Sequence, residues 1–362
     1  MGDAAMNTSH DVVLQVEDLS VSFPTDDGLV RAVRGVSYEV RRGEALGIVG
    51  ESGSGKSVSS LAVMGLLPKT AEVSGSTRVL GQETLGLSDA QISKIRGNKI
   101  AMIFQDPLTS LNPVYSIGFQ LAEAVQAHHD VSDDDARKRA IELLDIVGIP
   151  NPDQRVDAYP HEMSGGMRQR VVIAIAMAND PDVIIADEPT TALDVTVQAQ
   201  VLEALEAARR ETGAALVLIT HDLGVIAGHV DRVNVMYAGK LVETGTVDEI
   251  FYGPRMPYTL GLLGSLPRMD EARDAKLTPI LGTPPSLLNL PPGCPFAPRC
   301  PMAADICREH EPPLAPSGGP SQQAACHFSD RLEGATATDL FKPVAIDPEV
   351  MIEIVSEPEE QQ

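Results

Sequence analysis

A glycine-rich loop between a strand and a helix constrains the fold of this chain more than any other feature. The apolar segment EALGIVG leads into the loop, and apolar residues at helical spacing follow it as far as Pro68. The loop matches G-x-x-x-x-G-K-[ST] in the strand–loop–helix context that this motif requires. Its residues are Gly50, Glu51, Ser52, Gly53, Ser54, Gly55, Lys56 and Ser57.

The residue types of this loop suit a bound phosphate. Glycines let successive backbone N–H groups turn inward around an anion, and the start of the following helix adds its positive dipole end. Lys56 can reach the β- and γ-phosphates of a nucleotide, and the Ser57 hydroxyl is placed to bind Mg²⁺. The loop therefore predicts a nucleotide site.

Strands and helices alternate along most of the chain. Residues 12–50 hold three segments with strand-like alternation, and helical periodicity covers residues 117–148. A second amphipathic helix ends at Gly213. Apolar runs typical of buried strands recur at residues 100–104, 183–186 and 215–219. This order predicts an α/β fold with a parallel sheet.

Charge and composition exclude some function classes. The chain has 28 Lys and Arg against 51 Asp and Glu, which gives a net charge of −23. A nucleic-acid binder that relies on bulk electrostatics needs a basic surface, so we expect no nucleic-acid partner. The chain has no Trp and only 4% aromatic residues, which also argues against a base-stacking platform.

The start of the chain lacks the features of a secretory signal, because MGDAAMNTSHDVVLQ has neither a basic region nor an apolar one. Apolar stretches such as 171–178 are about half the length that a membrane span needs. We therefore expect a soluble, cytosolic chain that reaches a membrane only through a partner.

Polar residues follow several of the predicted strands. Asp187 and Glu188 come directly after the apolar run VIIA, where ligands sit in parallel sheets. We expect Asp187 to hold Mg²⁺ and Glu188 to act as general base for the attacking water. His221 follows the strand at 215–219, beside the expected γ-phosphate, and Gln105 follows the strand at 100–104. Gln105 could bind Mg²⁺ or water and report the nucleotide state.

Ser164, Gly165 and Gly166 precede a further apolar helix and make a second anion site. With this motif the chain resembles the ATP-binding subunits of ABC transporters over residues 12–260. The matching motifs, in the family's terms, are the Walker A loop 50–57, the Q-loop Gln105, the signature 163–167, the Walker B segment 183–188, the D-loop 192–194 and the switch histidine His221.

The resemblance implies a head-to-tail pair of such domains, in which each ATP lies between one domain's Walker residues and the other's signature. It implies a RecA-like P-loop core, an antiparallel β subdomain from 12–45 and a helical subdomain near 106–180. Phe23 is similar to the aromatic residue that stacks on adenine, and Asp194 belongs to the D-loop beside the nucleotide.

Several segments are similar to one subfamily, the oligopeptide/dipeptide importers. They are 105–113, 159–178, MPYTLGLL at 256–263 and GTPPSLLNLPPGCPFAPRC at 282–300. The chain departs from the usual pattern at Met256, Met163 and Met167. The subfamily implies a second ATPase subunit, two transmembrane permease subunits and an extracytoplasmic substrate-binding protein. It also implies a place at the cytoplasmic face of the membrane.

All four cysteines lie late in the chain, spaced Cys294-x5-Cys300-x6-Cys307-x18-Cys326. A short, loop-rich segment has little core of its own and needs a cross-link such as a metal site or disulfides. Four thiolates can hold Zn²⁺ or a [4Fe–4S] cluster. Short C-x2-C hooks are missing and some members of the subfamily carry a cluster here, so we favour iron–sulfur. Zinc, disulfides and free thiols remain alternatives, and His327 is a substitute ligand.

The sequence predicts three parts: an ATP-binding domain at 12–260, an irregular cysteine-containing extension at 261–330 and an acidic, disordered tail at 331–362. The expected function is ATP hydrolysis that drives import of di- or oligopeptides. Alternatives are an importer ATPase for nickel or another solute, a soluble ABC ATPase outside transport, and an iron–sulfur redox protein with a regulatory nucleotide site.

Overall fold

The computed structural model describes residues 11–191, 193–266 and 278–341. The chain divides into two compact units, unit 1 at Met1–Leu241 and unit 2 at Val242–Gln362. The domain boundary that the sequence predicts, after residue 260, therefore falls inside unit 2. The two units are described separately below.

Unit 1 contains a five-stranded parallel sheet in the order β9-β3-β8-β7-β6. Most of its side chains are buried on both faces, as the apolar runs predict. The central strand, β3, precedes the glycine-rich loop. The strands are β3 (Ala45–Val49), β6 (Ile100–Ile103), β7 (Val183–Asp187), β8 (Ala215–Thr220) and β9 (Arg232–Tyr237).

A separate antiparallel sheet in unit 1 has the order β2-β1-β4-β5. The sequence predicts its first two strands, but β4 and β5 were missed. Gly75 and several small polar residues weaken the alternation of β4, which is held by its pairing with β1. The strands are β1 (Val12–Thr25), β2 (Gly28–Arg41), β4 (Glu72–Val79) and β5 (Gln82–Glu83).

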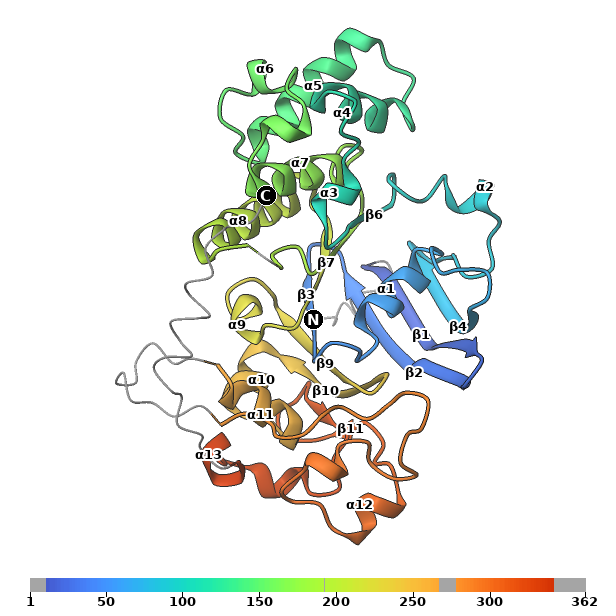
Figure 1. Cartoon of the computed structure of the whole chain (residues 1–362), viewed down its shortest axis with the longest axis vertical. Helices are drawn as coiled ribbons and strands as arrows, with labels where there is room; N and C mark the ends of the chain where they lie inside the picture. The colour runs from blue at the N-terminus through green and yellow to red at the C-terminus, as the bar shows by residue number, and fades with distance from the viewer. Residues whose placement is uncertain (1–10, 192, 267–277, 342–362) are drawn as a thin grey trace, which may run out of the picture. The chain divides into compact units, whose positions relative to one another are not determined.

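The helices of unit 1 mostly gather in one cluster. Figure 1 shows α4 to α7 beyond the ends of β6 and β7, apart from the antiparallel sheet. The first four helices are α1 (Lys56–Val63), α2 (Asp89–Ile92), α3 (Pro107–Ser110) and α4 (Ile117–Gln126). The others are α5 (Asp133–Ile146), α6 (Pro152–Arg155), η2 (Pro160–Glu162), α7 (Gly165–Ala176), α8 (Val195–Thr212) and α9 (Leu223–Ile226).

The single helical pattern predicted over 117–148 is two helices, α4 and α5. The break has a local cause, because Ser132 caps the start of α5 and its Oγ accepts a hydrogen bond from Asp135 N at 3.2 Å. α4 and α5 pack against each other, so the apolar faces of both helices are buried within the same cluster.

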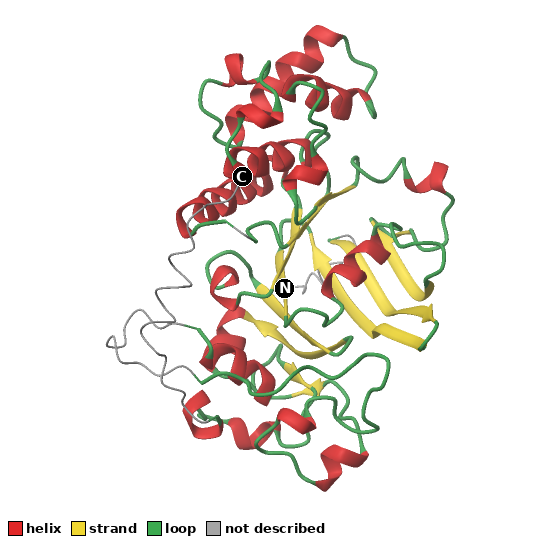
Figure 2. Cartoon of the chain, in the orientation of Figure 1, coloured by secondary structure: helices red, strands yellow, loops and turns green. Residues whose placement is uncertain are grey.

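Unit 2 consists of short elements joined by long loops (Figure 2). Its strand β10 (Lys240–Thr246), which begins just before the unit boundary, pairs antiparallel with β12. The remaining elements are α10 (Val247–Tyr252), α11 (Pro257–Gly264), η3 (Ala297–Arg299), α12 (Asp305–Glu309), β11 (Ala315–Pro316), β12 (Gln323–Ala324), η4 (Ser329–Leu332) and α13 (Ala337–Leu340).

Residues 331–341, which the sequence places in a disordered tail, belong to the core of unit 2. Leu332 and Ala337 are buried with Leu260 of α11, and Phe341 is also buried. Burial of these apolar side chains offsets the entropy of ordering the segment. The rest of the predicted tail, 342–362, lies outside the described residues.

A fully buried carboxyl group, Glu243 of β10, joins distant parts of unit 2. Its Oε1 accepts hydrogen bonds from Arg255 N at 2.5 Å and from Gln322 Nε2 at 2.9 Å. Oε2 is buried and has no hydrogen-bond partner. Burial raises the pKa of Glu243 to about 7, and these hydrogen bonds oppose the rise only in part.

This raised pKa predicts that unit 2 loses stability as the pH rises. Below pH 4.5 the carboxyl is neutral whether the chain is folded or not, so its contribution is complete. Above the folded pKa of about 7 a buried carboxylate remains, at a cost of about 3 kcal/mol. Hydrogen-exchange protection of Ala325 N, which donates to Val242 O, should fall between pH 5 and pH 8.

The matched variant is Glu243→Gln, which keeps the shape and the acceptor at Oε1 but cannot ionise. Its Ala325 protection should stay level across the same pH range and exceed that of the unaltered chain at pH 8. Equal pH dependence in the two proteins would contradict the burial of a titrating carboxyl.

Candidate nucleotide site

The loop 50–57 joins β3 to α1, and its shape depends on two glycines. Gly50 has φ 153° and Gly55 has φ 102°. A Cβ on Gly50 would lie 2.2 Å from the carbonyl oxygen of Met236, and one on Gly55 would lie 2.4 Å from that of Ala32. Because no side chain caps α1, its first N–H groups face the loop. The loop therefore has the close backbone approach and the uncapped helix start that the motif requires.

Lys56 lies inside this loop and is only 4% exposed. Its Nζ donates to the carbonyl oxygens of Gly50 at 2.7 Å and Glu51 at 3.1 Å. Burial lowers the pKa of Lys56, while the carboxylates of Glu188, Asp187 and Glu51 oppose the shift. The ammonium is thus held by two neutral carbonyl acceptors, which a negatively charged phosphate can replace.

Asp187 and Ser57 meet at the other side of the loop. Ser57 Oγ donates to Asp187 Oδ1 at 2.9 Å. Burial raises the pKa of Asp187, and the hydrogen bond from Ser57 opposes the rise. A hydroxyl and a carboxylate are oxygen ligands of the kind that Mg²⁺ prefers, so this pair fits the predicted ion.

Three polar contacts converge on one oxygen of Glu188. Its Oε2 accepts from Thr191 Oγ1 at 2.9 Å and from Gln105 Nε2 at 3.3 Å, and His221 Nδ1 lies 3.3 Å away. Glu188, Gln105 and His221 follow the neighbouring strands β7, β6 and β8, which explains why residues far apart in sequence meet here. Thr191 was missed, although its hydroxyl three residues after Glu188 was a signal that could have found it.

Ser164 and Gly165 are exposed at the start of α7, where Ser164 Oγ accepts from Met167 N at 3.3 Å. Gly166 is buried, and a Cβ there would lie 2.4 Å from Cγ1 of Val197 in α8. Asp194 is also exposed, and its Oδ1 accepts from Val197 N to cap α8. Ser164, Gly165 and Asp194 are therefore open to a partner.

The remaining predicted residues vary in exposure. Phe23 is half-buried in β1 and pairs with Val30 of β2. Ser52 and Gly53 are exposed at the tip of the loop. Ser54 is buried, and its Oγ has no hydrogen-bond partner. An unpaired buried hydroxyl in a phosphate loop is available to a ligand.

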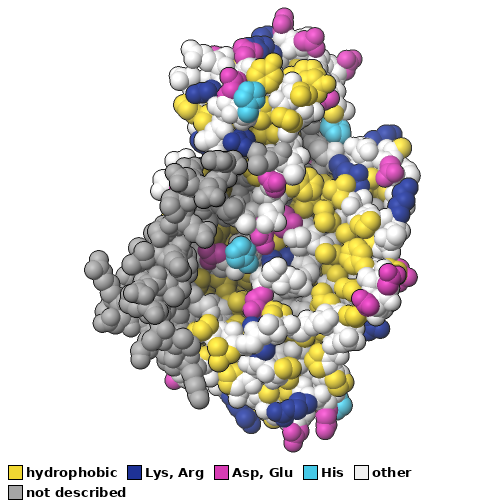
Figure 3. Space-filling model, in the orientation of Figure 1, with side chains coloured by type: hydrophobic (Ala, Val, Ile, Leu, Met, Phe, Trp, Pro, Cys, Tyr) yellow, Lys and Arg dark blue, Asp and Glu magenta, His cyan; other side chains and the backbone are white. Residues whose placement is uncertain are grey.

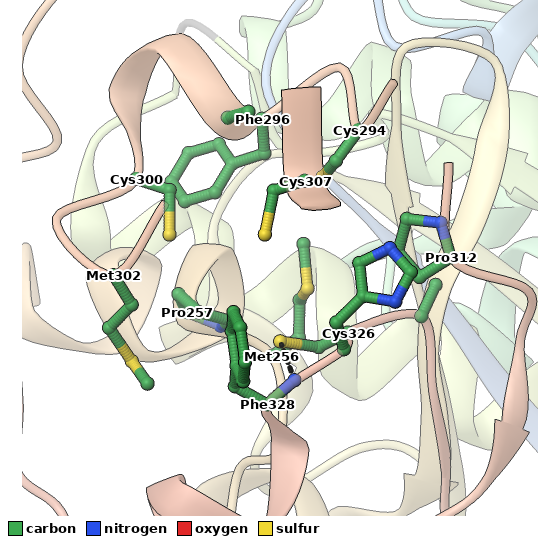
Figure 4. A pocket seen from close by; sticks show the side chains of 13 residues that line it. Met256, Pro257, Cys294, Phe296, Cys300, Met302, Cys307, Pro312, Cys326 and Phe328 are labelled. Atoms are coloured by element: carbon green, nitrogen blue, oxygen red, sulfur yellow. Dashed lines mark hydrogen bonds between the residues drawn. The ribbon is translucent and has the colours of Figure 1, made fainter. Parts of the chain in front are cut away.

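In unit 2, the four cysteines line one pocket. They are free thiols rather than disulfides, and the sulfur atoms of Cys300, Cys307 and Cys326 point into the pocket in Figure 4. Cys294 completes the set. The other lining side chains are largely apolar and include Met256, Phe296, Met302 and Phe328.

No group of three or more His, Cys, Asp or Glu side chains in the described ranges is arranged to hold one metal ion. Burial raises the pKa of Cys300 to about 12 and that of Cys326 to about 11, and it also raises the pKa of Cys294. Deprotonating them together requires a positive group among them.

None of the helices in the described part of the chain has both the length and the apolar character of a membrane span.

Comparison with known proteins identifies the two parts of the chain. Residues 33–191 match the ABC transporter family, and residues 242–307 match the oligopeptide/dipeptide transporter C-terminal region. The chain is similar to the ATP-binding cassette MJ0796 in a dimeric post-hydrolysis state with ADP and Pi, with a TM-score of 0.58 and 27% identity. That match covers 65% of this chain and 98% of the other.

Among curated relatives, the dipeptide transport ATP-binding protein DppD of Bacillus subtilis is 54% identical, over 82% of this chain and 88% of that protein. The oligopeptide transport ATP-binding protein OppD of Mycobacterium tuberculosis is 55% identical over 91% of this chain. The chain spans only 54% of that mycobacterial protein's length. The α/β ABC ATPase fold is confirmed, and the chain belongs to the family of oligopeptide and dipeptide ABC transporter ATP-binding proteins.

Proposed function

We propose that this chain is the ATP-hydrolysing subunit of an importer for di- or oligopeptides. The observation that carries the proposal is the convergence of Gln105, Thr191 and His221 on Glu188, next to the Ser57–Asp187 pair. A binding-only site has no need of a carboxylate beside the γ-phosphate. The similarity to peptide transport proteins supports the cargo.

Each residue has a role in this proposal. The loop 50–57 binds the phosphates, and Lys56 exchanges its two carbonyl acceptors for phosphate oxygens. Ser57 and Asp187, with Gln105 nearby, would hold Mg²⁺, which offsets phosphate charge when bound. Glu188 would take the proton from the attacking water, and His221, whose Nδ1 lies 3.3 Å from Glu188 Oε2, would lie beside the γ-phosphate.

A second ATPase subunit would complete the site. Ser164, Gly165 and Asp194 are exposed, so a partner's phosphate loop can approach them. The dimeric state of the similar cassette MJ0796 supports the pairing of two such subunits. Phe23 would stack on adenine in the same site. We do not expect a nucleic-acid partner, given the net charge of −23.

Two transmembrane permease subunits are the proposed membrane partners, and this chain would bind them at the cytoplasmic face of the membrane. An extracytoplasmic substrate-binding protein would join the complex through them.

The aromatic rings of Tyr115 and Phe119 form an exposed pair on the helical cluster. Their centroids lie 4.6 Å apart, and the two residues are 46% and 49% exposed. Phe119 also lines an open groove along α4 of about 690 Å³. Figure 3 shows hydrophobic side chains gathered on this helical cluster among charged ones. Exposed paired aromatics are typical of a protein interface.

Phe119→Asp should separate membrane docking from nucleotide binding. A buried carboxylate at the interface would lack a partner, so co-purification of the permease subunits with the tagged chain should fall at least tenfold. ATP binding by the variant should be unchanged, because Phe119 lies on α4 and away from the loop 50–57.

The matched control is Tyr252→Asp, because Tyr252 is an aromatic residue of unit 2 that is 87% exposed. It should co-purify permeases as the unaltered chain does. Full co-purification with Phe119→Asp would contradict the docking surface.

The cysteine pocket would hold a [4Fe–4S] cluster, with Zn²⁺ as the alternative. The donor set fits, because Cys294, Cys300, Cys307 and Cys326 line one apolar pocket. This proposal rests on the shared pocket and the free thiols alone, because no group of metal-ligating side chains in the described residues is arranged to hold a metal ion. The cluster would supply the positive charge that stabilises the thiolates and would tie Cys326 to the rest of unit 2.

The cargo is tested by uptake. The complex that co-purifies with this chain is placed in vesicles so that the chain and MgATP are in the lumen. Such vesicles should accumulate a labelled dipeptide that is supplied outside. Accumulation of nickel but not of peptide would favour the alternative cargo, and recovery of the chain without any permease would favour a soluble ABC ATPase.

A further inference from the structure

The geometry points to Thr191 as a positioning residue for the general base. Its hydroxyl holds one oxygen of Glu188 so that the other oxygen faces the attacking water. This inference rests on the proposed role of Glu188. It adds a residue that the sequence analysis did not include, because the contacts of Thr191 are made to the proposed base.

The contacts on Glu188 are unequal. All three recorded contacts, from Thr191, Gln105 and His221, reach Oε2, and none of them reaches Oε1. The Thr191 contact is the shortest, at 2.9 Å against 3.3 Å for the other two. It is also partly buried, whereas Gln105 and His221 are exposed. A shielded hydrogen bond to a carboxylate is stronger than an exposed one.

Thr191 is also the one of these three that shares a turn with Glu188. Thr191 N donates to Glu188 O at 3.3 Å, which closes the turn 188–191. Glu188 has φ 47°, in the left-handed region that side-chain-bearing residues seldom adopt. The backbone therefore sets an unusual direction for the Glu188 side chain, and the Thr191 hydroxyl fixes its far end.

Gln105 and His221 reach Glu188 from other strands. They follow β6 and β8, and each can move without any change in the turn. When water and the γ-phosphate occupy the site, their polar atoms have competing partners there. Thr191 is tied to Glu188 by the turn as well as by its hydroxyl, so it can hold the carboxylate during the proton transfer.

The test uses the complex that co-purifies with the full-length chain, with ATP hydrolysis measured against ATP concentration. Thr191→Val keeps the branched shape and loses the hydroxyl, so kcat should fall about tenfold, which is about 1.4 kcal/mol. KM should stay the same, because ground-state binding does not involve Thr191. Thr191→Ser restores the hydroxyl and should recover most of kcat.

Two comparisons separate positioning from general damage. In a Glu188→Gln background, Thr191→Val should cause no further loss, since the base it positions is gone. Thr212→Val removes a hydroxyl that donates to Ala208 O at the far end of α8, and it should leave kcat unchanged. A second ATPase subunit in the complex can contribute hydrolysis of its own. The rate of the Glu188→Gln complex measures that contribution, and it is subtracted from the rates of the other variants.

The outcomes distinguish this inference from the proposed function. If Glu188→Gln abolishes turnover but Thr191→Val has normal kcat, the positioning role is wrong and the general base stands. If Thr191→Val and Thr191→Ser are equally slow, the hydroxyl is not the cause and the inference also fails. If Glu188→Gln hydrolyses ATP normally, the base assignment itself is wrong.

Discussion

Glu188→Gln should bind MgATP as tightly as the unaltered chain and hydrolyse it at least about 100-fold more slowly. The amide keeps the volume of the carboxyl and an oxygen that can accept from Thr191, but it cannot take a proton from water. In the proposed site Lys56, Ser57 and Asp187 would bind the phosphates and the ion, and the hydrogen bonds that position them are made to Gly50, Glu51 and each other rather than to Glu188. Phosphate release and equilibrium nucleotide binding measure the two properties separately.

A matched control is Glu142→Gln on α5, which removes a carboxylate whose side chain is 63% exposed and pairs with Arg139. It should hydrolyse ATP normally, because an exposed ion pair contributes little. Normal turnover by Glu188→Gln would overturn the general base, and weak ATP binding would mean that Glu188 serves the phosphate loop instead.

The second large effect concerns the cysteine pocket of unit 2. Purified without oxygen, the full-length chain should be brown, with broad absorption near ~400 nm and about four iron atoms per chain. Cys326→Ser should lose both the colour and the iron, and unit 2 should become much less stable. When all four ligands come from one small unit, the cluster binds only the folded unit, so the free energy of cluster binding adds to the stability of the fold.

Met302→Leu is the control for this experiment, because Met302 lines the same pocket without a thiol. It should keep the iron content and the colour. A colourless protein with one zinc per chain would refute the iron–sulfur cluster, and a chain without metal that is equally stable after Cys326→Ser would refute both metals.

The parallel sheet and the phosphate loop could be predicted because their signals are local. A buried strand such as β7 is a continuous apolar run, and the acids that follow it must lie at the edge of the sheet. The loop needs its glycines for contacts that the sequence alone does not show, with Met236 and Ala32, but the motif already implies a close backbone approach.

Other features depend on partners distant in the sequence. β4 forms because β1, some 60 residues earlier, offers a free edge, as in the pairing of Leu14 with Val79. The order of residues 331–341 depends on the apolar surface of α11. The hydroxyl of Thr191 reaches Glu188 because a turn closes between them, which the residue types alone do not require.

The arrangement of the four cysteines also could not be predicted from local sequence. Their spacing predicts a shared ligand, but it does not tell whether the thiols pair with each other or surround a space. The structure places them around one pocket as free thiols, because β12 and the chain after it bring Cys326 beside the segment 294–307.

The pairing of Glu243 with Gln322 also has a consequence for the order of events on the ribosome. The two residues are 79 positions apart, so Glu243 emerges long before the side chain that covers it. Until Gln322 is made, Glu243 faces water and stays ionised at neutral pH. Unit 1 can fold during this time, since domains form as they are synthesised. Unit 2 cannot close before Gln322 is made, and because burial raises the pKa of Glu243 to about 7, closure near neutral pH draws protons from the solvent.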